Sequence, residues 1–138
     1  MKKPSSKITT LLLLFFVLQS YGQQLEELKK QYEKEIIGIW QSQDDPNYKV
    51  EYTKSGKMKE YIIGEKEVYI QSYLLKISCG KINPPHAYNI YLKMYETQEE
   101  KEDHFCGSIN NIHKDGKGII TLSITSERGK LELYTKVN

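Results

Sequence analysis

From residue 36 onward the chain alternates apolar and polar residues in short runs, and a period of two admits few folds other than β-sheets. Tyr88, Ile90, Leu92 and Met94 form the clearest run. Because successive side chains of a strand point to opposite faces, each run predicts a strand with one buried face. Eight strands are predicted, around residues 38–40, 48–54, 58–63, 68–77, 88–94, 105–112, 120–124 and 131–137.

The connections between these runs are nearly all short. Ser55-Gly56, His113-Lys-Asp-Gly116 and Glu127-Arg-Gly129 have the composition of hairpin turns. Neighbours in the sequence should therefore be neighbours in the sheet, which favours an up-and-down meander over a Greek key with its long crossings. A meander of eight strands can remove its open edges by closing. The predicted fold is all-β and antiparallel, an eight-stranded meander, and the order of the strands alone leaves open whether it closes into a barrel.

Residues 1–22 have the three parts of a secretory signal peptide. Lys2, Lys3 and Lys7 precede an apolar run at residues 8–18, and small residues stand at Ser20 and Gly22. The run has 11 residues, whereas a membrane span needs about 20. We therefore expect cleavage after Gly22, and a product that is secreted or periplasmic.

Removal of the signal peptide changes the charge balance. The full chain has 20 basic and 18 acidic residues and a net charge of +2. Three of the basic residues lie in the signal peptide, so the mature chain has a slight excess of acid. This balance argues against a nucleic acid or an anionic membrane as a partner.

Residues 23–35 are the one helical stretch that the pattern predicts in the mature chain. Leu25, Leu28, Tyr32 and Ile36 recur at spacings of three and four residues, so they share one face of a helix. Gly38 is a plausible end. An amphipathic helix of this length is expected to pack on the barrel as a lid or plug.

Cys79 and Cys106 are the only cysteines of the chain. Export places them in an oxidising compartment, where thiols form disulfides, and only one pairing is possible. The competing interpretation is a metal site that includes His104 and His113, but the paired ligand spacing of a zinc site is missing. A Cys79–Cys106 disulfide is predicted, worth roughly 3–4 kcal/mol in the chain-entropy model.

Several short motifs carry a resemblance to a known family. The helix is followed by Ile37-Gly-Ile-Trp40, then by Gln41-Ser-Gln-Asp-Asp-Pro-Asn-Tyr48 and Ser55-Gly-Lys57. Together with the Cys79-Gly80 step and Cys106, they resemble the lipocalin-like domain of small exported bacterial proteins over residues 36–138. The resemblance implies an eight-stranded barrel in which Trp40 plugs the end where the helix enters. Gly38 would face the same way as Trp40, and glycine would be needed there because a side chain would press on the helix.

The chain departs from that family at one position. In lipocalins an Arg near the end of the last strand usually stacks on the Trp, and the only Arg here is Arg128, in the turn before that strand. Lys136 is the nearest basic residue on the strand itself. Either Lys136 substitutes for the Arg, or this barrel closes differently.

Tyrosine is the most conspicuous residue type, with 11 in the chain. Those on predicted strands either fill the core and pair across strands or line a ligand cavity or binding surface. Tyr52, Tyr61, Tyr73 and Tyr91 are the possible ligand or partner contacts.

Catalytic motifs are missing from the sequence. His86, His104 and His113 lie in or beside connections and belong to no catalytic or metal-binding motif. The acidic segment 99–103 lacks the ligand spacing of a calcium loop and suggests a solvated surface. No catalytic residue, metal or cofactor is therefore predicted.

Two functional hypotheses remain from the sequence. One is an exported lipocalin-like binding protein that carries a small apolar ligand in its barrel. The other is an interaction module or inhibitor, in which a filled barrel presents a Tyr-rich surface to another exported protein. Eight strands enclose an interior that side chains can fill or that can hold one small ligand. The sequence alone leaves both open.

Overall fold

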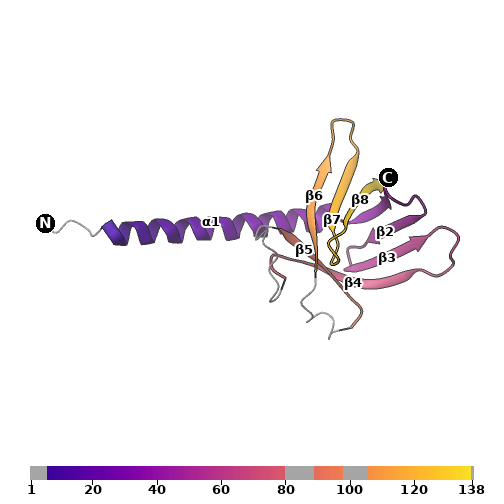
Figure 1. The fold of residues 1–138 in the computed structure, drawn as a ribbon, viewed down its shortest axis with the longest axis horizontal. Coiled ribbons are helices and arrows are strands. Elements are labelled where there is room, and N and C mark those ends of the chain that lie inside the picture. Colours follow the sequence, from indigo (N-terminus) through magenta and orange to yellow (C-terminus); the bar gives the residue numbers. More distant parts are fainter. Residues whose placement is uncertain (1–5, 80–88, 98–105, 138) are drawn as a thin grey trace.

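The computed structural model describes residues 6–79, 89–97 and 106–137, with side chains from residue 21 onward. One helix precedes eight strands (Figure 1). The elements are α1 (Ser6–Glu35), β1 (Gly38–Ser42), β2 (Tyr48–Tyr52), β3 (Lys57–Ile62), β4 (Tyr69–Lys76), β5 (Ile90–Tyr95), β6 (Gly107–Lys114), β7 (Ile120–Thr125) and β8 (Leu131–Val137). Each strand coincides closely with a run of alternating residues in the sequence.

The strands form a closed barrel in which every strand pairs antiparallel with its sequence neighbours and β1 pairs with β8. The predicted fold class is thereby confirmed. Trp40 of β1 lies opposite Val50 on β2 and opposite Lys136 on β8. The register shifts between Ile109 and Asn111, where β6 pairs with β7. Closure pairs the edge strands with each other, so neither offers an open row of backbone groups.

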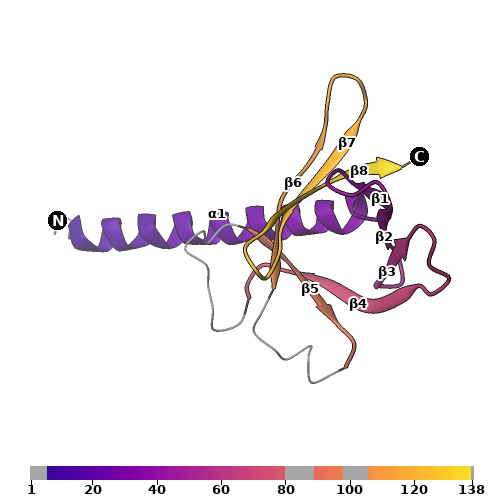
Figure 2. The ribbon, with the colours of Figure 1, turned by 45° about the vertical axis from the view of Figure 1, so that its right-hand side comes forward.

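Helix α1 begins earlier than predicted. The spacing of apolar residues in the mature chain predicts a helix from Gln23, but the helix starts at Ser6 and ends as expected at Glu35. Leucine is a strong helix former, and no proline interrupts residues 6–35, so the apolar run and the amphipathic stretch form one helix. Figures 1 and 2 show its C-terminal end at the barrel and its N-terminal half projecting away from it.

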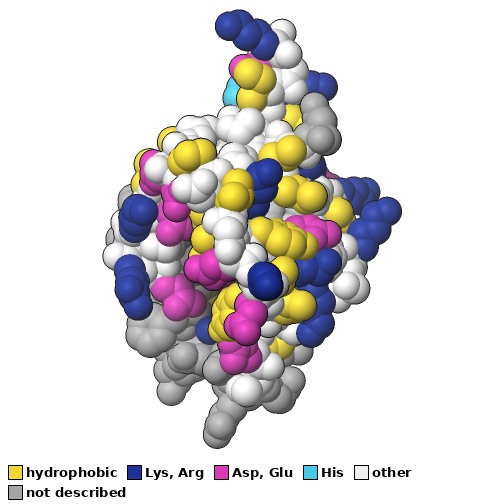
Figure 3. Space-filling view, turned by 90° about the vertical axis from the view of Figure 1, so that its right-hand side faces the viewer, with side chains coloured by type: hydrophobic (Ala, Val, Ile, Leu, Met, Phe, Trp, Pro, Cys, Tyr) yellow, Lys and Arg dark blue, Asp and Glu magenta, His cyan; other side chains and the backbone are white. Residues whose placement is uncertain are grey.

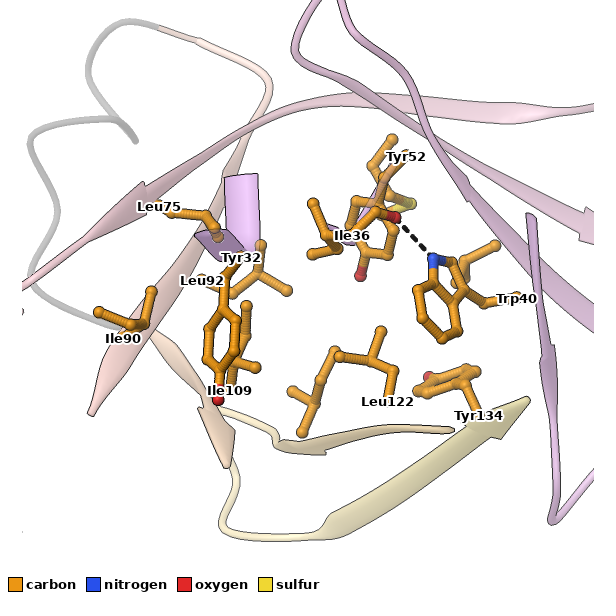
Figure 4. Packing of buried hydrophobic residues seen from close by; sticks show 13 residues of the cluster. Tyr32, Ile36, Trp40, Tyr52, Leu75, Ile90, Leu92, Ile109, Leu122 and Tyr134 are labelled. Carbon is orange, nitrogen blue, oxygen red and sulfur yellow. Dashed lines mark hydrogen bonds between the residues drawn. The ribbon is translucent and has the colours of Figure 1, made fainter. Parts of the chain in front are cut away.

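Charged and hydrophobic side chains both reach the surface at the end of the barrel. Figure 3, which views the end of the molecule away from the N-terminal half of α1, shows lysines and acidic side chains interspersed with hydrophobic ones. The inner face collects the alternating apolar residues of the strands, and Tyr32 of α1 and Ile36, directly after α1, join them (Figure 4). The C-terminal end of α1 is therefore part of the core.

In β8, the alternating apolar residues lie on the outer face of the barrel, and the residues between them face inward. Leu131 and Val137 are 55% and 40% exposed, whereas Tyr134 is 6% exposed and belongs to the core. Lys136 lies opposite Trp40 in the register, so the residues of β8 that face inward are those of even number. Pairing with β1 and β7 overrides the pattern of this strand.

Trp40 joins the helix to the barrel. Its side chain is fully buried, and its indole Nε1–H donates a hydrogen bond of 2.6 Å to the carbonyl oxygen of Ile36 (Figure 4). The last carbonyl groups of a helix have no partner within the helix. Trp40 supplies one such partner directly after the end of α1.

Lys136 lies over the buried indole of Trp40. Its Nζ lies 5.0 Å from the centroid of the Trp40 ring and donates a hydrogen bond of 2.8 Å to the carbonyl oxygen of Glu35. A cation at a helix C-terminus is favoured by the helix dipole, and a cation over an indole face is attracted to it. Lys136 is thus the basic residue of β8 that contacts the Trp40 ring.

Gly38 faces Lys136 rather than the helix. A Cβ built at Gly38 would lie 2.8 Å from Cε of Lys136, and no other residue is brought so close to it. The expectation that a side chain here would press on the helix is therefore wrong. The φ angle of Gly38 is +133°, which L-amino acids rarely adopt. Both observations require glycine at the point where α1 passes into β1.

We expect Gly38→Ala to destabilise the protein by about 1–3 kcal/mol, the usual range for a residue held in an unfavourable backbone region. The measurement is urea unfolding. Gly116→Ala is the matched control, because a Cβ at Gly116 meets no atom within 4 Å and its φ is not in the positive range. Equal stability of Gly38→Ala and the parent would contradict the prediction.

Cys79 and Cys106 form a disulfide, as predicted, with their Cα atoms 6.0 Å apart. Cys79 follows β4 and Cys106 directly precedes β6. The bond therefore ties together two strands that both pair with β5.

Candidate functional site

A small pocket extends through the barrel from the turn between β7 and β8, at the end opposite to α1, to Val50, which lies directly opposite Trp40. Along β8 the inward side chains are Lys136 at the helix end, then Tyr134, then Glu132. Four residues of strand span about 13 Å, so Glu132 lies well away from the plug. The pocket has a volume of about 80 Å³. Its apolar lining is Val50, Met58, Leu92, Met94 and Ile124, and its polar side chains include Tyr48, Tyr52, Tyr134, Glu60, Glu127 and Glu132.

Two tyrosine–glutamate pairs form the polar part of this pocket. The hydroxyl of Tyr134 donates a hydrogen bond of 2.9 Å to Oε2 of Glu132. Burial raises the pKa of the Tyr48 hydroxyl, and the negative charge of Glu60, which lies near it, raises it further. Glu60 shares the inner face of the sheet with Val50, which it opposes directly across β2 and β3. In each pair, a glutamate carboxylate inside the barrel has a tyrosine hydroxyl beside it.

The phenols of the pocket are held in their protonated form. Burial raises the pKa of Tyr134, and the negative charge and hydrogen bond of Glu132 raise it further. Burial also raises the pKa of Tyr48, with Glu60 adding to the shift. The pKa of Tyr52 is raised mainly by burial. At neutral pH all three hydroxyls are donors, and the carboxylates accept.

Of the four tyrosines predicted as contacts, only Tyr52 lines the pocket. Tyr73 packs edge-on against it, with ring centroids 5.0 Å apart, and donates a hydrogen bond of 2.9 Å to the carbonyl oxygen of Thr53. Tyr73 thus supports the position of Tyr52 from the adjacent wall.

The other two tyrosines do not face the barrel interior. Tyr61 donates a hydrogen bond to Glu51, which also pairs with Lys59. These three residues alternate with the inward residues of β2 and β3, so they lie on the outer face. Tyr91 is 2% exposed but stands between Ile90 and Leu92, which belong to the core. Tyr61 and Tyr91 therefore do not line this pocket, and their role as ligand or partner contacts stays a prediction.

Sequence analysis overlooked Tyr48, Tyr134, Glu60 and Glu132 as site residues. Residues two apart on a strand share a face, so the odd or even number of each residue is the sequence feature that could have placed them. Glu60 has the same parity as Met58, and Glu132 the same as Tyr134, so each stands on the face that holds a buried neighbour.

The remaining predicted polar candidates do not join this site. His113 is exposed on β6, and His86, His104 and the acidic segment 99–103 lie outside the described residues. In the part of the chain that is described, no group of three or more His, Cys, Asp and Glu side chains is arranged so that it could hold a metal ion.

A second hollow lies beside the plug. It has a volume of about 140 Å³ and is lined by Glu35, Ile112, Lys114, Ile120 and Lys136. It contains no aromatic side chain. Glu35 and Lys136 belong to the contact between α1 and the barrel wall, so this hollow is a product of helix packing.

Comparisons with models of protein families, with curated proteins and with solved structures found no match for this chain. None of the helices within the described residues combines the length and apolarity that a membrane crossing requires. Fold and site together define a class: a closed eight-stranded antiparallel barrel with a helix and a tryptophan at one end and a small pocket inside it.

Proposed function

We propose that this chain is an exported, lipocalin-like binding protein that holds a small and largely apolar ligand in its barrel. The pocket inside the barrel is the observation that carries the proposal. It combines a mainly apolar lining with a few placed polar groups, which is the usual composition of a ligand site. The mouth of a β-barrel is also a frequent position for such sites.

The volume of the pocket restricts the ligand. Pockets for drug-sized ligands measure about 300–1,000 Å³, and this one measures about 80 Å³. The aromatic side chains Tyr48, Tyr52 and Tyr134 fill much of the space that eight strands enclose. A ligand of only a few non-hydrogen atoms matches these dimensions.

Native mass spectrometry of the protein purified from its own export route tests this function. A retained small molecule supports it. Ser126→Trp places a bulky ring at a small residue of the pocket lining and should abolish retention. Ser123→Trp on the outer face of β7 is the matched control and should leave retention unchanged. Equal retention by both variants would show that the molecule is bound elsewhere.

Export is supported by the disulfide, because such bonds persist in oxidising compartments. We expect the exported product to begin at Gln23 or within two residues of it, since Ser20 and Gly22 have the small side chains that a signal peptidase requires. N-terminal sequencing of the exported protein provides the measurement. An exported product that begins at Met1 would contradict the prediction.

A second candidate function is an interaction module or inhibitor that binds another exported protein. It is favoured by the hairpin of β3 and β4, which carries five exposed hydrophobic side chains: Ile62, Ile63, Val68, Tyr69 and Ile70. Patches of this kind often mark protein interfaces. In the same native mass spectrum, a retained protein that is lost in an Ile63→Ser/Ile70→Ser variant would favour this candidate over ligand carriage.

A further inference from the structure

The charge of the pocket is negative. Glu60, Glu127 and Glu132 are among the described residues that line it, and none of those residues is basic. The phenols near the two inward glutamates, Tyr134 at Glu132 and Tyr48 at Glu60, are neutral, so they do not cancel the negative charge. An anionic ligand would meet like charges at close range in a partly desolvated site.

The carboxylates also have spare acceptor capacity. An ionised carboxylate offers about four lone-pair positions. Tyr134 occupies one position on Glu132. A ligand that donates hydrogen bonds and carries positive charge can use the remaining positions, whereas a purely apolar ligand would leave them without a partner.

Aromatic and apolar surfaces complete the site. Tyr48, Tyr52 and Tyr134 supply rings whose faces attract organic cations. Val50 and Leu92 supply an apolar surface for an alkyl or aryl group. The same chemistry already operates within this barrel, where the ammonium of Lys136 lies 5.0 Å from the centroid of the Trp40 ring.

We propose that the pocket binds a small organic ammonium ion, with its charged nitrogen at Glu60 and Glu132 and its apolar body against Val50 and Leu92. This inference rests on the proposed function and adds the ligand class. An organic cation is favoured over a metal ion, because the described residues contain no group of side chains suited to hold a metal.

Three probes of matched size test the charge: n-butylammonium, n-butanol and n-butyrate. They are titrated by isothermal calorimetry at neutral pH into protein expressed as the full chain and purified after export. We expect n-butylammonium to bind at least 10-fold more tightly than n-butanol, and n-butyrate not to bind. Any retained native ligand is first removed by dialysis, and mass spectrometry checks that the pocket is empty before titration.

Three isosteric variants locate the charge effect. Glu132→Gln and Glu60→Gln should each weaken n-butylammonium binding by about 10-fold, which corresponds to 1.4 kcal/mol, and should leave n-butanol binding nearly unchanged. Glu51→Gln is the matched control, because Glu51 lies on the outer face with Lys59 and Tyr61. Trp40 fluorescence checks that each variant is folded.

The outcomes separate the two proposals. If n-butanol binds as tightly as n-butylammonium to the parent, the ammonium inference is wrong and a small-ligand pocket remains. If none of the three probes binds, the small-ligand function is wrong as well. If n-butylammonium is preferred but Glu51→Gln removes the preference as strongly as Glu132→Gln, the cation binds on the outer face and the inference is overturned.

Discussion

Replacing Trp40 with alanine is expected to lower the free energy of unfolding by about 3–5 kcal/mol, the range for a buried Trp. Trp40 is fully buried in the core cluster. The variant would leave the carbonyl oxygen of Ile36 without its donor and Lys136 without the ring beneath it. Since single domains are stable by about 5–15 kcal/mol, this loss is a large part of the total. Urea unfolding followed by circular dichroism provides the measurement.

Two further variants separate the contributions. Ile39→Ala is the control, because Ile39 is the neighbour of Trp40 on β1 but is 40% exposed. Trp40→Phe keeps an aromatic ring and removes the donor, so it should fall between the parent and Trp40→Ala. As the only tryptophan, Trp40 should give a blue-shifted emission that resists quenchers. Emission typical of a solvated indole, or unfolding of Trp40→Ala close to that of the parent, would contradict the role as a plug.

Removal of the disulfide has the second large expected effect. Reduction, or the double variant Cys79→Ser/Cys106→Ser, should lower the free energy of unfolding by roughly 3–4 kcal/mol, because the denatured chain regains the freedom of the closed loop. The melting temperature should fall, while the far-ultraviolet spectrum at low temperature should keep its β signature. The bond links only the segments before β6 and after β4, and the pairing of all eight strands is independent of it.

The control for this experiment is the reducing agent added to the double variant, where it should have no further effect. An intact mass of the oxidised parent should also be two hydrogens below that of the reduced chain. An unchanged melting temperature after complete reduction would show that the loop contributes nothing to stability.

Different residues of the barrel interior are expected to serve stability and binding. The inward residues of β8 illustrate this division, with Lys136 at the plug and Glu132 in the pocket. Changes at Trp40 or Gly38 should therefore act on unfolding, and changes at Glu60 or Glu132 on ligand affinity. A ligand that binds only the folded protein would also raise its free energy of unfolding through mass action.

The sequence by itself was sufficient to predict the strands and their order. Alternation with a period of two depends only on the local geometry of a strand, and the Gly-containing turns after Lys54 and Lys114 make sequence neighbours pair. With short connections throughout, a closed meander is the solution that pairs both edges. The disulfide was also predictable, because two cysteines allow one pairing.

Only the tertiary structure decided which face of each strand points inward and what fills the barrel. In β8 the leucines mark the outer face, because the register with β1 places Lys136 beside Trp40 and turns Tyr134 and Glu132 inward. The extension of α1 back to Ser6 was equally hidden, since helix-forming residues precede the amphipathic stretch. The pocket escaped prediction for a physical reason. A buried carboxylate is tolerated only with partners, and the partners of Glu60 and Glu132 come from faces whose direction is fixed by the closure of the barrel.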